Sequence, residues 1–260
     1  MEIEEHNRMR DLYLDLLIKI LANTIYEDPS TNPDNAGPFQ PNLRAEGRDW
    51  PALAHTMIGL RRLDNIRDLA QRVVDEGTPG DLLEAGVWRG GSCILMRGIL
   101  AANAIKDRKV YVVDSFTGLP PPKPDEFPHD EGLNLHLYDQ LAVSLEQVQA
   151  NFDRYGLLDE QVIFVKGLFQ DTLPLLNAGP FALIRLDGDL YESTSVALES
   201  LYPKLSPGGF IILDDFNFLP ACQQAVMDYR SRFGITAAMH QVDWCASWWQ
   251  KPSLVPQSIL

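Results

Sequence analysis

The sequence has little cysteine and no long apolar run. Its three cysteines, Cys93, Cys222 and Cys245, are odd in number and widely spaced, which excludes a zinc motif and an evident disulfide framework. No apolar stretch approaches the roughly 18 residues that a membrane-spanning helix needs. Low-complexity tracts are also missing, while 45% of the residues are apolar. These features exclude wholesale disorder and favour one α/β domain with extensions, or at most two small domains.

Basic residues are few relative to acidic ones. The 260 residues include 22 Lys and Arg against 36 Asp and Glu, which gives a net charge of −14 at pH 7. A surface this acidic repels phosphate backbones and anionic lipids, so we expect neither nucleic acid nor a membrane as a partner. The N-terminal stretch 1–15 is acidic and amphipathic, unlike a secretory signal. Together with the cysteine usage, this favours a cytoplasmic location.

Short apolar segments alternate with helical patterns from residue 81 onward. Strands are expected at 81–86, 109–114, 161–167, 181–187 and 210–215 and as a final pair near the end, and helices at 91–104, 143–155, 170–176, 193–204 and 219–232. Such alternation predicts an α/β fold, a mostly parallel sheet with helices on both faces. Before it, residues 9–26 have helical spacing, and residues 52–76 are expected as one or two helices.

Polar, proline-rich stretches interrupt this pattern. Residues 27–49 are expected as a loop or a mobile arm, and the SPGG sequence at 206–209 as a turn. Residues 120–136 are too many for an ordinary strand-to-helix connection and predict a lid or binding loop. Ligands of parallel sheets bind at the carboxyl ends of the strands, so we expect the functional residues at four strand ends.

At the first strand end, Glu84 precedes a glycine-rich turn at 86–91 and a helix. The turn's G-x-x-x-G-G spacing matches neither the G-x-G-x-x-G pattern of dinucleotide folds nor a phosphate-binding loop with its lysine, which disfavours a nucleotide-dependent oxidoreductase. Glycines allow close approach of a ligand, and the helix N-terminus favours a carboxylate. An acid beside that turn suits an ammonium group, so an amino-acid moiety fits both. The alternative is an ordinary strand-to-helix turn.

Two further strand ends offer weaker signals. The segment from Asp114 to Gly118 follows the second strand, and an acid there accepts hydrogen bonds from ribose hydroxyls. A helix cap explains the same Asp-Ser pair. Gly167 and Leu168 follow the third strand, where the backbone offers an edge for an adenine ring, although ordinary loop chemistry explains them as well.

The fourth signal is the strongest. Asp187 and Asp189 end one strand, and Asp214 and Asp215 end the next, so parallel pairing would bring four carboxylates together. Neighbouring carboxylates repel one another unless a cation or shared protons relieve them, and oxygen ligands favour a hard ion such as Mg²⁺ or Ca²⁺. A spare carboxylate can serve as a general base. Solvated aspartates that cap helices are the alternative.

These sites together predict one chemistry. An amino-acid end, a ribose and an adenine lined up across three strands fit S-adenosylmethionine (SAM), whose sulfonium suits an acidic pocket. A divalent ion beside it would chelate two acceptor oxygens and lower the pKa of a hydroxyl. The sequence therefore predicts metal-dependent O-methylation. A protein of the same fold that binds the cofactor without catalysis remains an alternative.

The motifs resemble the macrocin O-methyltransferase family, which includes sugar O-methyltransferases of the tylosin, mycinamicin and novobiocin type. The matching stretches run from about residue 12 to 250 and include AHTMIG at 54–59, GDLLEAGVWRGGSCILMRGIL at 80–100, IRLDGDLYEST at 184–194 and LSPGGFIILDDF at 205–216. The resemblance implies a class I SAM-methyltransferase fold with a seven-stranded, Rossmann-like sheet. It also implies a helical N-terminal extension and arm at 1–76, a methyltransferase domain at 77–260 and a lid at about 120–142.

The resemblance also implies site residues and partners. It assigns Mg²⁺ to Asp187, Asp214 and Asp215, and the general base to Asp189. The implied SAM contacts are Thr56, Met57, Glu84, Ala85, Gly86, Val87, Trp88, Asp114, Ser115, Phe116, Thr117, Gly118, Gln149, Gly167 and Leu168. A homodimer or higher homo-oligomer and a glycosylated natural product as acceptor, in antibiotic biosynthesis, are implied as well. An aromatic or other small-metabolite hydroxyl is the alternative acceptor.

Several aromatic and histidine residues have two interpretations. Trp50, Trp244, Trp248 and Trp249 are expected in an acceptor wall or, more commonly for tryptophan, in a core or interface. His129 and His136 lie in the lid region and His55 precedes the Thr-Met pair, where each is a ligand contact or a structural histidine. Cys93 follows the glycine-rich turn on an apolar helix and is expected as a buried thiol.

Overall fold

A seven-stranded sheet forms the centre of the computed structural model, which describes residues 2–253. Its strand order is β3-β2-β1-β4-β5-β7-β6. The strands are β1 (Asp81–Ala85), β2 (Val110–Asp114), β3 (Val162–Lys166), β4 (Phe181–Leu186), β5 (Leu205–Leu213), β6 (His240–Gln241) and β7 (Ser247–Gln250). The first five are parallel, and β7 pairs with β5 and β6 in antiparallel fashion. The predicted α/β fold with a mostly parallel, seven-stranded sheet is confirmed.

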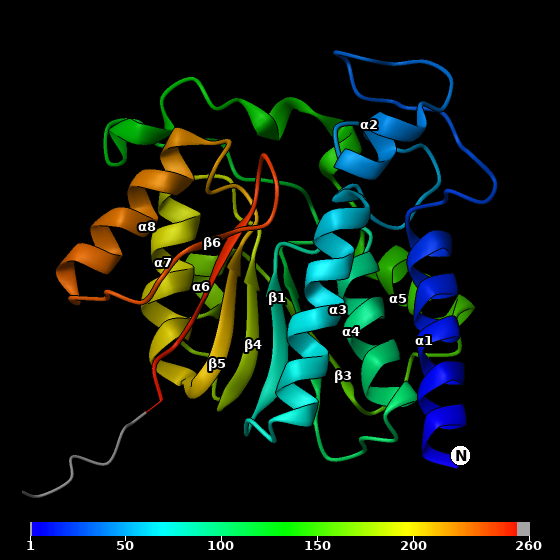
Figure 1. Cartoon of the computed structure of the whole chain (residues 1–260). Coiled ribbons are helices and arrows are strands. Elements are labelled where there is room, and N and C mark those ends of the chain that lie inside the picture. The colour runs from blue at the N-terminus through cyan, green and yellow to red at the C-terminus, as the bar shows by residue number, and fades with distance from the viewer. Residues whose placement is uncertain (1, 254–260) are drawn as a thin grey trace, which may run out of the picture.

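Helices cover both faces of this sheet (Figure 1). They are α1 (Glu2–Leu21), α2 (Pro41–Glu46), α3 (Gly59–Asp75), α4 (Gly91–Ala102), α5 (Leu145–Arg154), α6 (Phe169–Thr172), α7 (Tyr191–Leu201) and α8 (Pro220–Arg232), with short 3₁₀ turns η1 (Pro128–Asp130), η2 (Leu135–Leu137), η3 (Asp139–Leu141) and η4 (Tyr202–Lys204). Helices α3 and α4 pack on one face and α7 and α8 on the other, while α1 packs on α3 and α4.

Alternation along the strands explains the two cores. Leu82 points into the cluster built with α1, α3 and α4, while the next residue, Leu83, points into the cluster built with α7 and α8. Both side chains are fully buried, as are most residues of β4 and β5. A strand buried on both faces needs apolar residues at every position, which is why these strands read as continuous apolar runs.

Four expectations about elements are corrected. The SPGG sequence at 206–209, expected as a turn, lies within β5, where it forms a bulge. Leu205 pairs with Phe181 and Phe210 with Leu183, and the residues between have no register partner on β4. The Gly208 N–H donates instead to the carbonyl oxygen of Lys251 at 2.9 Å. Helix α3 begins only at Gly59, and α6 covers four residues rather than 170–176. The helix expected at 9–26 begins earlier and ends at Leu21.

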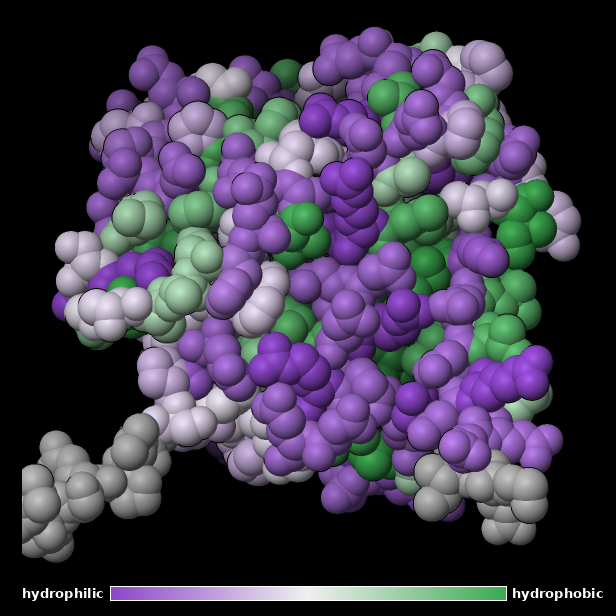
Figure 2. Space-filling view, in the orientation of Figure 1, coloured by the Kyte–Doolittle hydropathy of each residue, from purple (hydrophilic) through white to green (hydrophobic). Residues whose placement is uncertain are grey.

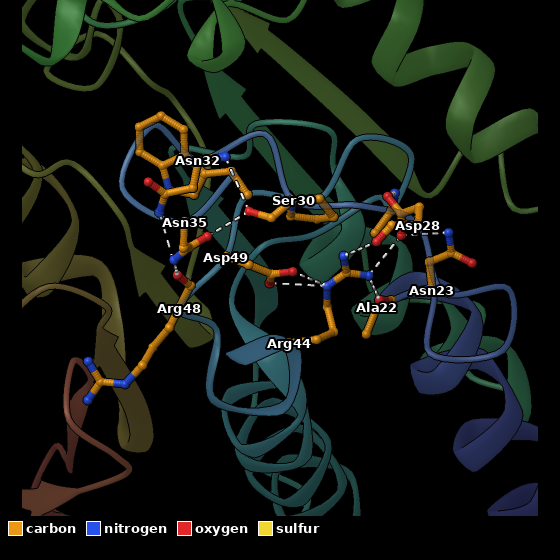
Figure 3. A network of polar contacts seen from close by, with 12 residues as sticks. Ala22, Asn23, Asp28, Ser30, Asn32, Asn35, Arg44, Arg48 and Asp49 are labelled. Carbon is orange, nitrogen blue, oxygen red and sulfur yellow. Dashed lines mark hydrogen bonds and ion pairs between the residues drawn. The ribbon is translucent and has the colours of Figure 1, made fainter. Parts of the chain in front are cut away.

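The segment 27–49, expected as a loop or a mobile arm, contains α2 and is held by a buried arginine. Arg44 on α2 is 1% exposed and pairs with Asp28 and Asp49 at 2.8 Å each (Figure 3). It also donates to the carbonyl oxygen of Ala22, which follows α1. A buried charge with this many partners orders the arm, which leads directly into the wall of the cavity described below.

Within residues 2–253, we find no helix with the length and hydropathy needed to cross a bilayer.

Candidate active site

A cavity of about 240 Å³ opens at the carboxyl ends of β1, β2, β4 and β5, and residues of the segment 120–142 form part of its lining. Fourteen of the predicted site residues line it: Thr56, Met57, Glu84, Gly86, Val87, Trp88, Asp114, Ser115, Gly118, Leu168, Asp187, Asp189, Asp214 and Asp215. The structure places the other five, Ala85, Phe116, Thr117, Gln149 and Gly167, outside this lining. Ala85 lies outside the lining because side chains alternate along β1. It faces the α7 and α8 side, while its neighbour Glu84 faces the cavity.

The glycine-rich turn after β1 brings the backbone close to β4. Gly86 has a φ of 88°, and a Cβ there would lie 1.8 Å from the carbonyl oxygen of Asp187. Only glycine fits such a position. Gly90 also adopts the left-handed conformation, with a φ of 85°, and precedes the first residue of α4. The turn therefore presents the N-terminus of α4 to the cavity.

Glu84 and Asp114 are buried acids with different partners. The Glu84 carboxylate contacts the Arg185 guanidinium and accepts a hydrogen bond from the Cys93 thiol at 2.9 Å. Burial raises the pKa of Glu84, and the positive charge of Arg185 opposes this. Asp114 accepts backbone N–H bonds from Val87 and Phe116, each at 2.8 Å. It therefore ties the turn after β1 to the turn after β2.

The predicted acidic cluster is present at the ends of β4 and β5. Carboxylate oxygens of Asp187, Asp189 and Asp215 all lie within 4.8 Å of one another. Burial and the nearby negative charge of Asp214 raise the pKa of Asp189 to about 7. Burial and the neighbouring carboxylates also raise the pKa of Asp187 and Asp215 well above the usual range. Oxygen atoms this close fit a hard divalent cation.

Asp214 differs from the other three acids because two arginines bind it. Arg185 of β4 contacts one of its carboxylate oxygens, and Arg62 of α3 donates to the other at 2.6 Å. Burial alone would raise the pKa of Asp214, but Arg185 and Arg62 hold it below the usual value. A second group within 4.8 Å joins Asp214, Asp215 and the buried Cys245. Asp214 therefore links the acidic cluster to two buried arginines, Arg185 and Arg62.

The residues predicted from the sequence did not include these two arginines. Arg185 is 1% exposed and pairs with Glu84, Asp187 and Asp214. Its signal is present in the sequence, since a lone arginine interrupts the apolar strand FALIRL of β4. A charge inside a buried strand requires partners, and strand-end acids are the nearest candidates. Arg62, by contrast, lies in a helix with several arginines, and nothing in the sequence distinguishes it as the buried one.

Aromatic and apolar residues surround the outer part of the cavity. Trp244 lies edge-to-face with Phe218 at a centroid distance of 4.9 Å, and its indole N–H donates to the carbonyl oxygen of Glu46 at 2.7 Å. Trp50 lies edge-to-face with Tyr138 of the lid at 5.2 Å. Leu135 and Leu141 of the lid complete this wall. The arm, the lid and the loop before β7 thus meet at the cavity mouth.

The positions of the tryptophans and histidines decide between the two interpretations that the sequence left open. Trp50 and Trp244 line the cavity, whereas Trp249 is fully buried in the core and Trp248 stacks on His240. The cavity lining does not include His129, His136 or His55. Cys93 is buried, as expected, and burial raises the pKa of its thiol well above the usual value.

His55 is expected to make the fold sensitive to acid. Burial, together with the charges of Arg154 and Arg89, lowers the pKa of its imidazole to about 4, and the ring lies 2.7 Å from the Tyr155 hydroxyl. Because the unfolded chain takes up this proton near pH 6.5 and the folded chain near pH 4, stability falls as the pH drops through that window. We expect His55→Gln to reduce the loss of unfolding free energy between pH 7 and 5 by roughly 1 to 2 kcal/mol. Urea unfolding at the two pH values measures this, and equal losses in both proteins would contradict it.

Comparison with known proteins decides the family. Residues 29–251 match the family model described as Macrocin-O-methyltransferase (TylF). The chain belongs to the macrocin O-methyltransferase family. Demethyldecarbamoylnovobiocin O-methyltransferase of Streptomyces niveus is 49% identical over 252 residues, which cover 95% of this chain and 96% of that protein. The family resemblance stated from the sequence motifs is confirmed.

Two further relatives agree with this membership. The 8-demethyl-8-(2,3-dimethoxy-alpha-L-rhamnosyl)-tetracenomycin-C 4'-O-methyltransferase of Streptomyces olivaceus is 50% identical over 252 residues, 96% of each chain. The solved structure of the O-methyltransferase NovP superposes with a TM-score of 0.90 at 50% identity, covering 94% of this chain and 99% of that one. The chain is therefore a SAM-dependent O-methyltransferase. Family membership also decides against the oxidoreductase and the non-catalytic alternatives considered from the sequence.

Proposed function

We propose that this enzyme transfers the methyl group of SAM to a hydroxyl of a sugar carried by a natural product, with Mg²⁺ at the acidic cluster. The observation that carries the proposal is that the acidic cluster lines the same cavity as the glycine-rich turn and the aromatic wall. A methyl donor on the turn and an acceptor entering at the mouth would meet beside these carboxylates. The rhamnosyl group in the name of the tetracenomycin relative supports a sugar as acceptor.

The SAM site of the proposal uses the turn after β1. Glu84 is suited to the cofactor's ammonium group, and the N-terminus of α4 to its carboxylate. Thr56 and Met57 line the same side, and the loop from Asp114 to Gly118 is assigned to the ribose. The further predicted contacts, Ala85, Phe116, Thr117, Gln149 and Gly167, lie around this lining and remain part of the proposal.

The metal site of the proposal consists of Asp187, Asp214 and Asp215. Asp215 has carboxylate oxygens within 4.8 Å of those of Asp187 in one group and of those of Asp214 in the other. Burial and this crowding raise the pKa of Asp187 and Asp215, and oxygen ligands of this kind fit Mg²⁺. The oxygens of Asp214 keep lone pairs beyond those that accept from Arg62 and Arg185. When bound, the ion would polarise an acceptor hydroxyl and lower its pKa.

The protein's own residues would accept the proton of the hydroxyl and position the donor and the acceptor. Asp189, with its pKa near 7, is placed to accept the proton of the acceptor hydroxyl. The apolar wall of Trp50, Trp244 and Leu135 excludes water from the acceptor. The turn after β1 would hold the methyl donor, and the end of β4 the acceptor oxygen, so that the methyl group is transferred in line.

A labelled acceptor panel tests the proposal. Incubation with [methyl-¹³C]SAM and Mg²⁺ is expected to label rhamnosides and related deoxysugar glycosides, as seen by mass spectrometry and ¹³C NMR. Catechols of similar size are the matched controls, because two neighbouring oxygens also chelate the ion in them. Labelling of the catechols but none of the glycosides would replace the sugar acceptor with an aromatic one.

We infer that the enzyme is a homodimer and that α1 forms its interface. Met9, Leu12, Leu16 and Ile20 form a second apolar stripe on α1, turned away from the core and 38–61% exposed. Figure 2 shows apolar side chains along the right-hand edge, where α1 lies in Figure 1. A second copy in antiparallel pairing would cover the stripe and bring the acidic first turns of α1 toward the partner's basic Lys19 end, which offsets the repulsion between two chains of charge −14.

Leu16→Asp is expected to convert the dimer to a monomer. Each variant interface would lose two buried leucine side chains, so dimerisation should weaken at least about 100-fold. Light scattering across a dilution series measures the effect. Leu175→Asp is the matched control, because Leu175 is 81% exposed outside α1 and should leave the dimer unchanged. A monomeric wild type, or a dimeric Leu16→Asp variant, would contradict the inference.

A further inference from the structure

Helix α7 begins with a cap that comes from a distant part of the chain. Its N-cap residue, Leu190, has an apolar side chain that cannot accept a hydrogen bond from the first turn. Asp130 of η1 takes this role instead. Its two carboxylate oxygens accept from the backbone N–H of Tyr191 at 2.6 Å and of Glu192 at 3.2 Å. A carboxylate at this place also interacts favourably with the helix dipole.

Asp130 is unusual for its position in the lid. It is 0% exposed, although most side chains between residues 121 and 131 are exposed. Two neighbours strengthen the attachment. The Lys123 ammonium lies 2.7 Å from the Glu192 carboxylate, and the His129 ring stacks on the Tyr191 ring at 5.1 Å. The first half of the lid is thus fixed to the first turn of α7.

The capped turn directly follows the proposed base. Asp189 has a φ of 56°, a left-handed conformation that is uncommon for residues other than glycine. On its N-terminal side, the end of β4 is fixed in the sheet, and the Asp189 N–H donates to Asp215 at 3.3 Å. On its C-terminal side, the buried Leu190 comes first, and the backbone N–H groups of Tyr191 and Glu192 that follow donate to Asp130. Asp130 therefore fixes one of the two ends of the turn that orients Asp189.

We propose that Asp130 is a positioning residue for methyl transfer, which couples the lid to the orientation of Asp189. The proposal rests on the proposed function of Asp189 as general base. Asp130 contacts neither cofactor nor acceptor in this assignment. Its action is indirect: with the lid in place the first turn of α7 is capped, and the turn at 188–190 holds the Asp189 carboxylate toward the cavity.

The test compares three variants of the full-length enzyme. Asp130→Ala removes both hydrogen bonds, and Asp130→Asn keeps one acceptor oxygen and the side-chain shape. Asp125→Asn is the matched control, because Asp125 is an exposed acid of the same lid segment. Each is assayed with saturating SAM and Mg²⁺ and the most active glycoside of the acceptor panel. Calorimetry with S-adenosylhomocysteine follows the cofactor site separately.

We expect Asp130→Ala to lower kcat roughly 10- to 100-fold, the loss associated with small misplacements of a catalytic group. Asp130→Asn should give an intermediate rate, and Asp125→Asn the wild-type rate. Affinity for S-adenosylhomocysteine should be unchanged in all three. An increase in acceptor KM at unchanged kcat would overturn the proposal, because Asp130 would then act only in closing the lid over the acceptor.

A double-variant cycle separates this inference from the proposed function. In an Asp189→Asn background, Asp130→Ala should lower the residual rate less than about 3-fold, because the group that it positions is already lost. The same loss in both backgrounds would overturn the inference. A wild-type rate for Asp189→Asn alone would refute the proposed base. A wild-type rate for Asp130→Ala beside an inactive Asp189→Asn would refute only the positioning role.

Discussion

Asp189→Asn is expected to lower kcat about 100- to 10,000-fold, the range that general-base removal costs in other enzymes. Asparagine keeps the shape of the side chain but cannot accept the proton of the acceptor hydroxyl. The variant should still fold, because Asp189 makes no ion pair among the described residues and its own N–H bond to Asp215 comes from the backbone. Single-turnover methyl transfer measures the loss.

Binding measurements distinguish this result from damage to the site. Asp189→Asn should bind S-adenosylhomocysteine as tightly as the wild type, since Glu84 and the turn after β1 are unaffected. Asp187→Asn is the comparison variant, because it should weaken Mg²⁺ binding and show partial rescue of the rate at high Mg²⁺. A rate within about threefold of the wild type for Asp189→Asn would remove Asp189 as the base.

Arg185→Met is expected to destabilise the fold by about 3–5 kcal/mol, the cost of leaving buried charges without their partner. The guanidinium contacts Glu84, Asp187 and Asp214, and all three residues line the cavity. Methionine fills a similar volume but leaves them to repel one another. Part of the loss would be offset by proton uptake, so the variant should regain stability at lower pH.

Urea unfolding at pH 7 and 6 measures both parts of this expectation. Arg232→Met is the matched control, because Arg232 pairs with Glu199 on the surface, where both side chains are more than half exposed. Exposed pairs contribute about 1 kcal/mol or less. A loss below about 1 kcal/mol for Arg185→Met would show that the buried carboxylates do not depend on this arginine.

Strand ends were the part of the site that the sequence could locate. Strands β1, β2, β4 and β5 are apolar runs with an acid at or next to the last residue, namely Glu84, Asp114, Asp187 and Asp214, and parallel pairing brings such ends to one edge. The glycine-rich turn was visible for the same reason, because its glycines follow a strand and precede a helix. Local pattern and sheet topology were sufficient for these positions.

The supporting contacts could not be read from local pattern. Arg185 and Glu84 are 101 residues apart, Asp130 caps a helix 61 residues away, and Arg62 reaches Asp214 across 152 residues. Each partner choice depends on how whole elements pack. The SPGG sequence shows the opposite failure. Its composition is typical of a turn, but the flanking residues Leu205 and Phe210 pair with β4, and the sequence between them bulges within one continuous strand.

The central claim is that methyl transfer by this family member takes place beside a divalent ion held by the acidic cluster. The most direct test is the rate of [methyl-¹³C] transfer to the best glycoside with Mg²⁺ and with EDTA, at a SAM concentration that calorimetry shows to be saturating in both. We expect unchanged cofactor binding and a loss of methyl transfer in EDTA that added Mg²⁺ restores. Equal transfer rates with Mg²⁺ and with EDTA would contradict it.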